Sequence, residues 1–313
     1  MPFDLYTHCS LCPRRCGANR SAGDTGFCGQ TDQCRVAATC RHFGEEPSFA
    51  GTRGSGTIFF SGCACRCFFC QNHQISRENI GRPVSSRQLF ELAMALVQKG
   101  VHNLNFVTPD HFWPHIKTAC IELRNSGVTI PFIYNCSGYA LPEQIDQAAD
   151  LIDIFLPDFK FAAPDLARTC MKDRHYPEIA LAAIRRMVNA RGFLTPWDPS
   201  GQKTARTGVL VRHLVLPGQT ADSLDILSLL YREFGPELPL SVMSQFYPTP
   251  ACHDRHLFTR PLPLTEYDRV CRHIEDLGFE RVYIQPESGD EAFLPDFTKD
   301  RPFAGNEDLE NSI

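Results

Sequence analysis

The sequence predicts an α/β fold in which parallel strands alternate with helices. From Gly54 onward, short runs rich in β-branched and aromatic residues alternate with stretches whose apolar residues recur at helical spacing. Such alternation implies parallel pairing through right-handed crossovers. From the pattern alone, an open partial barrel and a doubly wound sheet both remain possible. Either architecture places chemistry at the carboxyl ends of the strands.

The predicted strands follow one another along most of the chain. Their number, about six or seven, is below the eight strands of a complete TIM barrel. The runs lie at residues 57–61, 103–107, 131–134, 151–156, 209–216, 240–243 and 281–284.

Helices are predicted between these strands. After the first strand, Ser85 or Ser86 can cap a helix that Gly100 ends. Its apolar residues recur at i, i+3, i+4 and i+7: Leu89, Leu92, Ala93 and Leu96. Further helices are predicted over residues 175–190, 221–234 and 265–277.

Three segments differ in composition. Residues 1–50 form a leader rich in Cys, Gly and Arg, which lacks a long apolar period and is expected to depend on a metal or on docking. Residues 51–295 carry the predicted barrel. Residues 296–313 are polar, with five acids against two basic residues, and are expected to form a flexible acidic tail.

Composition excludes several classes of protein. No run approaches the roughly 18–20 uncharged apolar residues that span a bilayer, and the first residues do not resemble a signal peptide. A cytoplasmic location is therefore expected. The net charge of −5 gives no general attraction to nucleic acid or to an anionic membrane, so neither is expected as a partner.

Cysteine is the unusual residue of this chain. It has 15 cysteines, an odd number, and ten of them precede residue 71. In a long chain without a secretion signal, this density favours thiolate–metal coordination over disulfides. The five later cysteines are scattered and are expected to pack as small hydrophobic residues.

Three cysteines follow the first predicted strand at C-x3-C-x2-C spacing: Cys63, Cys67 and Cys70. Three thiolates on one short loop can hold one face of a [4Fe–4S] cubane and leave its fourth iron open. A zinc site that uses this loop is the alternative. Cys65 lies inside the triad, which makes other triads possible; we assign it a packing or spare-thiol role.

The segment from Gly62 to Asn72 resembles the cluster motif of the radical S-adenosylmethionine superfamily. Its ending, Cys70-Gln71-Asn72, is similar to the branch related to pyruvate formate-lyase activating enzymes. The likeness extends to the segments 9–17, 19–20, 26–28, 45–47 and 54–57, and this set resembles activating-enzyme homologues with a cysteine-rich leader. The resemblance covers residues from about 9 to 290.

This resemblance implies a fold and an activity. The fold is a partial (β/α)6 TIM-type barrel with a small N-terminal cysteine-rich segment. The cofactors are a [4Fe–4S] cluster and S-adenosylmethionine, whose reductive cleavage gives a 5′-deoxyadenosyl radical that removes a substrate hydrogen. The protein would be an oxidoreductase, and a glycyl-radical-activating role is one possibility. Its expected partners are an electron donor such as flavodoxin or ferredoxin and a protein substrate.

Candidate cofactor contacts stand at the ends of the predicted strands. The hydroxyl of Thr108 can accept from the ammonium group of the cofactor, in a segment that departs from the usual Gly-Gly-Glu type. Asn135 and Ser137 suit a ribose. Asp158 and Lys160 resemble the Asp-x-Lys pair of the activating branch, and Lys160 can reach the cofactor carboxylate.

Two further candidates follow the fifth and sixth strands. Arg212 lies inside an apolar run, where a charge must be paired or face a cavity. Gln245 stands where activating enzymes carry a histidine that contacts the cofactor. The plainer alternatives are a turn around Ser137 and a surface salt bridge for Lys160.

The leader carries four cysteines at C-x2-C-x3-C-x11-C spacing: Cys9, Cys12, Cys16 and Cys28. Four thiolates suit either a tetrahedral zinc ion or an auxiliary iron–sulfur cluster. Both remain open. Two rivals to the leading hypothesis also remain: radical chemistry directly on a peptide or small metabolite, and a non-catalytic zinc protein in which leader and loop are both structural.

Overall fold

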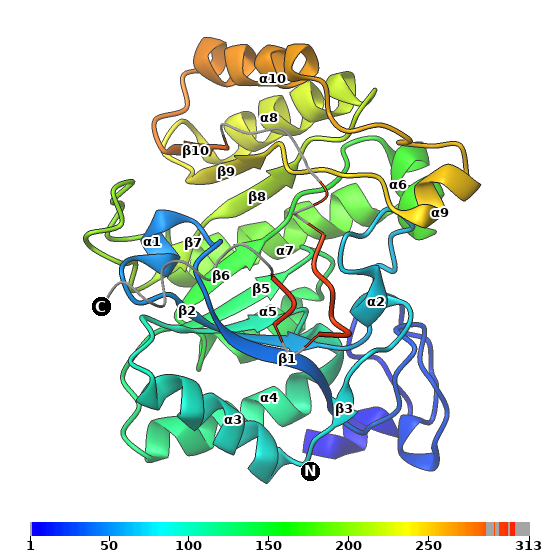
Figure 1. Ribbon diagram of the computed structural model, residues 1–313, viewed down its shortest axis with the longest axis vertical. Helices are drawn as coiled ribbons and strands as arrows, with labels where there is room; N and C mark the ends of the chain where they lie inside the picture. Colours follow the sequence, from blue (N-terminus) through cyan, green and yellow to red (C-terminus); the bar gives the residue numbers. More distant parts are fainter. Residues whose placement is uncertain (1, 286–290, 292–293, 300, 304–313) are drawn as a thin grey trace.

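Parallel strands lie side by side in a curved, open sheet with helices along its outer face (Figure 1). The computed structural model describes residues 2–285, 291, 294–299 and 301–303. The strands are β1 (Arg35–His42), β2 (Ser55–Phe60), β3 (Arg82–Pro83), β4 (Leu104–Val107), β5 (Phe132–Cys136), β6 (Ile154–Pro157), β7 (Gly208–Val209), β8 (Val211–Leu214), β9 (Leu240–Met243) and β10 (Val282–Ile284).

The helices alternate with these strands. The α-helices are α1 (Pro47–Ala50), α2 (His73–Ser76), α3 (Ser86–Gln98), α4 (Trp113–Asn125), α5 (Pro142–Ala149), α6 (Pro164–Met171), α7 (Tyr176–Arg191), α8 (Thr220–Phe234), α9 (Pro250–Asp254) and α10 (Leu264–Leu277). The 3-10 helices are η1 (Pro2–Tyr6), η2 (Arg20–Ala22) and η3 (Asp110–Phe112).

The parallel pairing runs continuously from β2 to β10. Strands β2, β4, β5, β6 and β7 pair in that order, and β8, β9 and β10 form a second parallel sheet. The two sheets are joined in two ways. A parallel bridge links Asp158, after β6, to Arg212 of β8, and only Leu210 separates β7 from β8 in the chain. The expected partial barrel is confirmed, and every strand run expected from the sequence is present.

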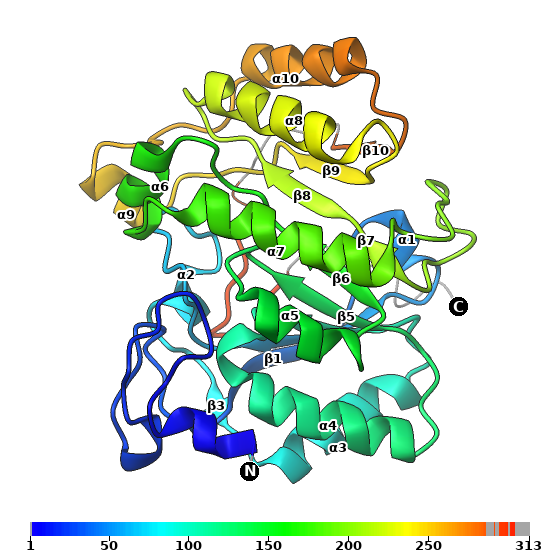
Figure 2. The same cartoon turned by 180° about the vertical axis from the view of Figure 1, so that it is seen from behind.

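Local sequence explains why the helices begin where they do. Ser85 caps α3 with a capping box, in which its hydroxyl accepts from the Gln88 amide and the Gln88 side chain accepts from the Ser85 amide. Proline stands in the first turn of α1, α4, α5, α6, α7 and α9, where its missing N–H costs nothing. Figure 2 shows α4, α5, α7 and α8 lying across the outer face of the strands.

The concave face of the sheet is covered by two short segments. Phe49 of α1 packs with Ile133, Ile154 and Leu156. Phe297, which is 5% exposed, packs on Phe59 with ring centroids 5.5 Å apart. Residues 296–299 and 301–303 therefore differ from the expected flexible tail, because Phe297 and Phe303 bury apolar rings. The other residues of that predicted tail lie outside the described ones.

The leader also differs from expectation. Its part from Arg35 onward is not a separate segment, because β1 pairs antiparallel with β2. β3 then pairs antiparallel with β1. These edge strands have little apolar alternation, so no strand was predicted there. The short helices α5 and α6 and the longer α4 were also absent from the prediction.

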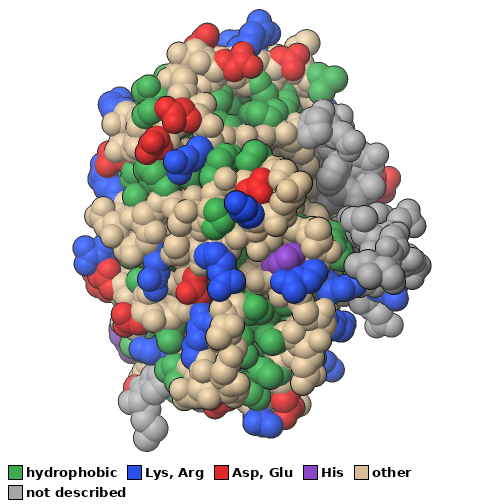
Figure 3. Space-filling view, turned by 90° about the vertical axis from the view of Figure 1, so that its left-hand side faces the viewer, with side chains coloured by type: hydrophobic (Ala, Val, Ile, Leu, Met, Phe, Trp, Pro, Cys, Tyr) green, Lys and Arg blue, Asp and Glu red, His purple; other side chains and the backbone are tan. Residues whose placement is uncertain are grey.

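The face that carries the amino ends of the parallel strands has no single dominant charge. Figure 3 shows basic and acidic side chains interspersed there, with hydrophobic side chains in small separate groups. None of the described helices is long and apolar enough to cross a membrane.

Candidate functional site

The predicted cluster loop lies at the carboxyl end of β2, where the open barrel edge gathers the ends of its neighbours. Cys63, Cys67 and Cys70 all carry free thiols on this loop. Cys67 is buried, whereas Cys63 and Cys70 are half-buried. The amide of Cys65 donates to Cys63 Sγ at 3.3 Å. The loop thus presents three sulfurs with one already held by a backbone donor.

Glycine is required where this loop begins. Gly62 has a φ of +85°, and a Cβ at this position would lie 2.8 Å from the carbonyl oxygen of Cys28. Only glycine adopts this conformation without strain and leaves room for the leader. The cluster loop and the leader are therefore in backbone contact.

Lys160 is the positive charge that faces the cluster loop. It forms a short ion pair with Asp158, which the sequence offered as the alternative to a cofactor contact; the contact to the cofactor carboxylate stays a prediction. Burial alone lowers the pKa of Lys160, but Asp158 and the nearby Cys67 overcome this effect and raise the pKa well above its usual value. Its charge also acts on Cys70. The ammonium group therefore stays protonated beside the three thiols.

Tyr176 holds the ends of β5 and β6 together at this edge. Its hydroxyl accepts from the amide of Lys160 at 2.8 Å and lies 2.9 Å from the carbonyl oxygen of Ser137. The same hydroxyl is 3.1 Å from the carbonyl oxygen of Asp158. Sequence reasoning did not identify Tyr176, because a tyrosine at the start of a helix carries no motif.

Ser137 and Gly138 lie where β5 ends beside the loop. The thiol of Cys65 donates to Ser137 Oγ at 3.0 Å, which places Cys65 between the loop and β5 rather than in solvent. Gly138 has a φ of +72°, and a Cβ there would lie 2.3 Å from the carbonyl oxygen of Asp158. The backbones of β5 and β6 can approach this closely only with glycine. The side chain of Asn135, which lies in β5 two residues before Ser137, is half-buried.

Thr108 has an unusual backbone conformation at the end of β4. Its φ is +54°, and such values are outliers for a β-branched residue. Its amide donates to the carbonyl oxygen of Asn135 at 2.8 Å. Strain of this kind is concentrated at functional sites. The backbone conformation of Thr108 is therefore a second reason, besides its hydroxyl group, to consider it a candidate site residue.

The residues that follow β9 and β10 connect the far side of the opening to the loop. The side-chain amide of Gln71 donates to the backbone oxygen of Gln245 at 3.0 Å. Gln285 bonds both the backbone amide and the side chain of Gln245 at 3.2 Å. Gln245 is thus held beside the cluster loop with Gln285 as a partner, and its contact to the cofactor stays a prediction.

Arg212 is committed to an ion pair inside the barrel. Its guanidinium binds the carboxylates of both Glu45 and Glu46, and all three side chains are at most 12% exposed. Asn105 donates to Glu45 at 2.7 Å. The charge that was expected to be paired or to face a cavity therefore has two carboxylate partners, and a contact of Arg212 to the cofactor stays a prediction. Glu45 and Glu46, directly before α1, are adjacent acidic residues that could have indicated these partners. The sequence analysis used residues 45–47 only as part of the family likeness.

Asp110 and His111 lie on the outer side of the sheet. Tyr134 donates to Asp110 at 3.1 Å, and burial raises the pKa of this carboxyl to about 6. His111 contacts the carbonyl oxygen of Ser61 at 2.7 Å, while burial and the charge of Arg20 lower its pKa to about 3. Both groups are occupied in joining η3 to neighbouring elements.

Three of the four leader cysteines, Cys9, Cys16 and Cys28, lie near a buried arginine. Arg20 is fully buried, and its Nη1 lies 3.6 Å from Cys9 Sγ and 2.8 Å from the carbonyl oxygen of His111. A Cβ on Gly26 would be 3.4 Å from the sulfurs of both Cys16 and Cys28. Backbone amides of Arg14, Ala18 and Gln30 bond the sulfurs of Cys12, Cys16 and Cys28 respectively.

The charge of Arg20 and the burial of the leader thiols act in opposite directions. Among the described residues, no carboxylate pairs with its guanidinium. Burial lowers the pKa of Arg20, but Cys28, Tyr6 and Cys9 outweigh it and raise the pKa. Burial raises the pKa of Cys28 and raises that of Cys12 to about 12, whereas a buried charge without a counter-charge costs several kcal/mol. Arg20 therefore offers a counter-charge to thiolates that a bound metal would hold.

The donor set of the cluster loop fits a [4Fe–4S] cluster. Within the described parts of the chain, no three Cys, His, Asp or Glu side chains converge on a single metal ion. A cubane does not require such convergence, because each thiolate binds a different iron. Three free thiols on one loop, with a cation beside them, match that requirement and leave one iron without a protein ligand.

Comparison with known proteins agrees with this site. Residues 57–230 match the radical SAM superfamily. The chain is also 24% identical to an uncharacterized protein of Methanocaldococcus jannaschii over 286 residues, which cover 90% of this chain and 78% of that protein. Members of this superfamily are enzymes that bind a [4Fe–4S] cluster and S-adenosylmethionine and need a reductant. The superfamily match spans more than half of the chain, from the first strand of the barrel to α8, and the chain therefore belongs to the radical SAM superfamily.

Proposed function

We propose that this chain cleaves S-adenosylmethionine reductively at a [4Fe–4S] cluster held by Cys63, Cys67 and Cys70. The observation that carries the proposal is the arrangement of three free thiols on one loop with the Asp158–Lys160 pair beside them. With cluster and cofactor bound, the reaction supplies methionine and a 5′-deoxyadenosyl radical that removes a hydrogen atom from a substrate.

The residues of this chain bind and orient the cofactor. Lys160 attracts the carboxylate of the cofactor, and Asp158 fixes the position of the Lys160 ammonium group. The segment at Thr108 offers its hydroxyl and backbone oxygens to the amino group. Asn135 and Ser137 supply amide and hydroxyl groups to the ribose. Gln245, held by Gln285, lines the opposite side of the opening.

The substrate that we propose is a glycine in a partner protein, as for the activating enzymes whose Cys-Gln-Asn ending and Asp-x-Lys pair this chain resembles. Reduced protein incubated with S-adenosylmethionine and candidate glycyl-radical proteins should produce a glycyl radical signal by electron paramagnetic resonance. Hydrogen transfer to 5′-deoxyadenosine from a labelled peptide or small metabolite, without that signal, would replace this substrate with the alternative one.

The leader, in this proposal, holds a second metal centre with Cys9, Cys12, Cys16 and Cys28 as ligands. The buried guanidinium of Arg20 supports thiolates there, and the lack of convergence on one ion within the described residues favours a cluster over zinc. Protein with Cys63, Cys67 and Cys70 all changed to Ala should retain iron and sulfide after anaerobic reconstitution. One zinc ion and no iron in that variant would establish a structural zinc site instead.

The experiment that tests the main proposal is anaerobic. Reconstituted protein, reduced with dithionite and given S-adenosylmethionine, should release 5′-deoxyadenosine and methionine in equal amounts. An intact, reduced cluster that releases neither product would remove the enzymatic interpretation.

A further inference from the structure

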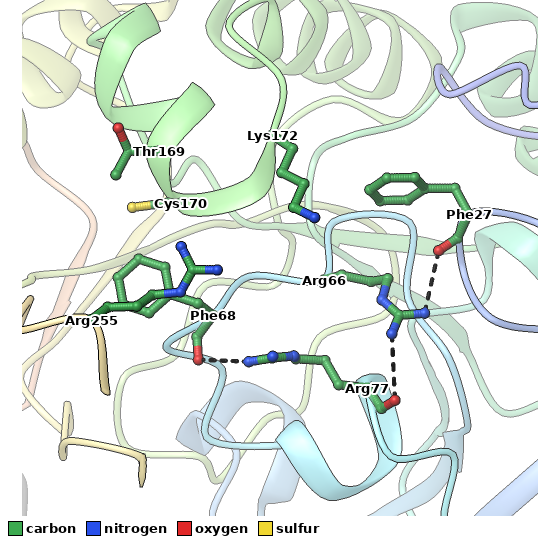
Figure 4. Close-up of a pocket in the computed structure, with 8 residues that line it drawn as sticks. All are labelled: Phe27, Arg66, Phe68, Arg77, Thr169, Cys170, Lys172 and Arg255. Carbon is green, nitrogen blue, oxygen red and sulfur yellow. Dashed lines mark hydrogen bonds between the residues drawn. The ribbon is translucent and has the colours of Figure 1, made fainter. Parts of the chain in front are cut away.

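A basic pocket lies on the outside of the cluster loop. It has a volume of about 290 Å³ and is lined by Phe27, Arg66, Phe68, Arg77, Thr169, Cys170, Lys172 and Arg255. These residues come from the leader, the cluster loop, the end of α2, α6 and the end of α9. Figure 4 shows the side chains of Arg66, Arg77, Lys172 and Arg255 around one space.

The four cations of this pocket have no acidic counterpart among its lining residues. Arg66 and Arg77 are half-buried and are held by backbone oxygens, since Arg66 bonds Phe27 and Arg77, and Arg77 bonds Phe68. Lys172 and Arg255 are exposed. Like charges this close repel one another, and the chain as a whole carries a net charge of −5. The pocket is therefore a local positive region on a chain of negative net charge, and an anionic partner would offset the repulsion among its cations.

The pocket shares its wall with the cluster loop. Arg66 and Phe68 flank Cys67 in the chain, and the amide of Phe68 donates to the carbonyl oxygen of Cys170 at 3.2 Å. Arg255 lies over the Phe68 ring, 5.0 Å from its centroid. In Figure 1 the elements around this pocket, α2, α6 and α9, surround the carboxyl ends of the strands. A partner seated here would be separated from Cys67 by little more than the loop itself.

We propose that this pocket docks an acidic flavin-containing one-electron carrier protein that reduces the cluster. The inference rests on the proposed function, because that function needs one electron from outside. The carrier is oxidised by one electron and the cluster is reduced by one; no bond forms or breaks in this step. Weak redox encounters use small, charge-complementary surfaces, and the carbonyl-held arginines give this surface a fixed geometry.

The test reverses the two exposed charges. Lys172→Glu/Arg255→Glu in the full chain leaves Cys63, Cys67, Cys70 and Lys160 untouched. With reduced flavodoxin as the probe, 5′-deoxyadenosine should form about tenfold more slowly at low salt than in the wild type. With photoreduced deazaflavin, a small uncharged donor, both proteins should react at rates within about twofold. Added KCl should slow the flavodoxin reaction of the wild type and not that of the variant.

The matched control carries the same change in net charge at a distance. Lys99→Glu/Arg272→Glu reverses two exposed cations, one directly after α3 and one on α10, and should behave as the wild type with both donors. Wild-type rates and salt dependence for Lys172→Glu/Arg255→Glu with flavodoxin would overturn the docking proposal. Inorganic phosphate that binds through Lys172 and Arg255 without slowing flavodoxin would overturn it too, in favour of a small-anion site. Absence of product with either donor would instead remove the proposed function.

Discussion

The two cysteine-rich segments of this chain differ in how many thiols they bring together and in what surrounds them. The cluster loop has three thiols that we assign as ligands, besides Cys65, which bonds Ser137. Lys160, beside these ligands, is paired with Asp158 at an opening of the barrel. The leader has four cysteines that we propose as ligands, and three of them, Cys9, Cys16 and Cys28, lie near Arg20. Arg20 is fully buried and bonds backbone oxygens. Three ligands leave a coordination position for a cofactor, whereas four ligands close a centre. In our proposal this difference separates a reactive site from a structural or electron-carrying one.

The largest expected effect comes from removing one thiol of the loop. Cys67→Ala should lower 5′-deoxyadenosine formation by more than about a thousandfold, since two thiolates do not retain the cluster. Cys271→Ala, on the distant α10, is the control and should keep wild-type iron content and rate. Iron and product are both measured after anaerobic reconstitution. Undiminished activity in Cys67→Ala would show that the thiols of the cluster loop do not hold the reactive cluster.

The next effect tests the buried charge of the leader. Arg20→Gln removes the guanidinium beside the sulfurs and should destabilise the protein by about 3–5 kcal/mol, because a negative metal–thiolate centre would lose its counter-charge. Arg15→Gln changes an exposed arginine in the same segment and should have little effect. Thermal unfolding and retained metal report the result. Equal stability of the two variants would show that the leader sulfurs carry no charge.

A smaller effect is expected at the cation beside the loop. Lys160→Gln should raise the S-adenosylmethionine concentration for half-maximal rate by about 10- to 100-fold, since it removes a charge-assisted contact to the cofactor carboxylate. The control is Lys99→Gln, an exposed lysine at the end of α3. Steady-state kinetics under anaerobic conditions distinguish them. An unchanged half-saturating concentration in Lys160→Gln would reduce the Asp158–Lys160 pair to a structural ion pair.

The smallest effect is expected at Cys65, which lies inside the triad but donates to Ser137. Cys65→Ala should keep its iron and a rate within about threefold of the wild type, because the thiol packs rather than ligates. Iron counted per chain, with Cys67→Ala beside it, provides the measurement. Loss of iron in Cys65→Ala would mean that this loop uses a different triad.

Sequence patterns predicted the parallel strands because their apolar, β-branched runs are local signals. They did not predict β1, whose residues alternate weakly and whose partner β2 lies beyond α1. Within the site, strand alternation predicted that Asp158 and Lys160 lie on the same side of the chain, and their ion pair agrees with this. Tyr176 and the Glu45–Glu46 partners of Arg212 did not, because contacts across 18 to 167 residues depend on how the elements pack.

The central claim is that three thiolates hold a cubane whose fourth iron accepts the cofactor. Electron paramagnetic resonance of the reduced protein tests it most directly. Addition of S-adenosylmethionine should shift the signal of the reduced cluster, and cofactor labelled with ¹⁷O at its carboxylate should show coupling to the iron. A cluster signal that S-adenosylmethionine leaves unchanged would contradict the claim.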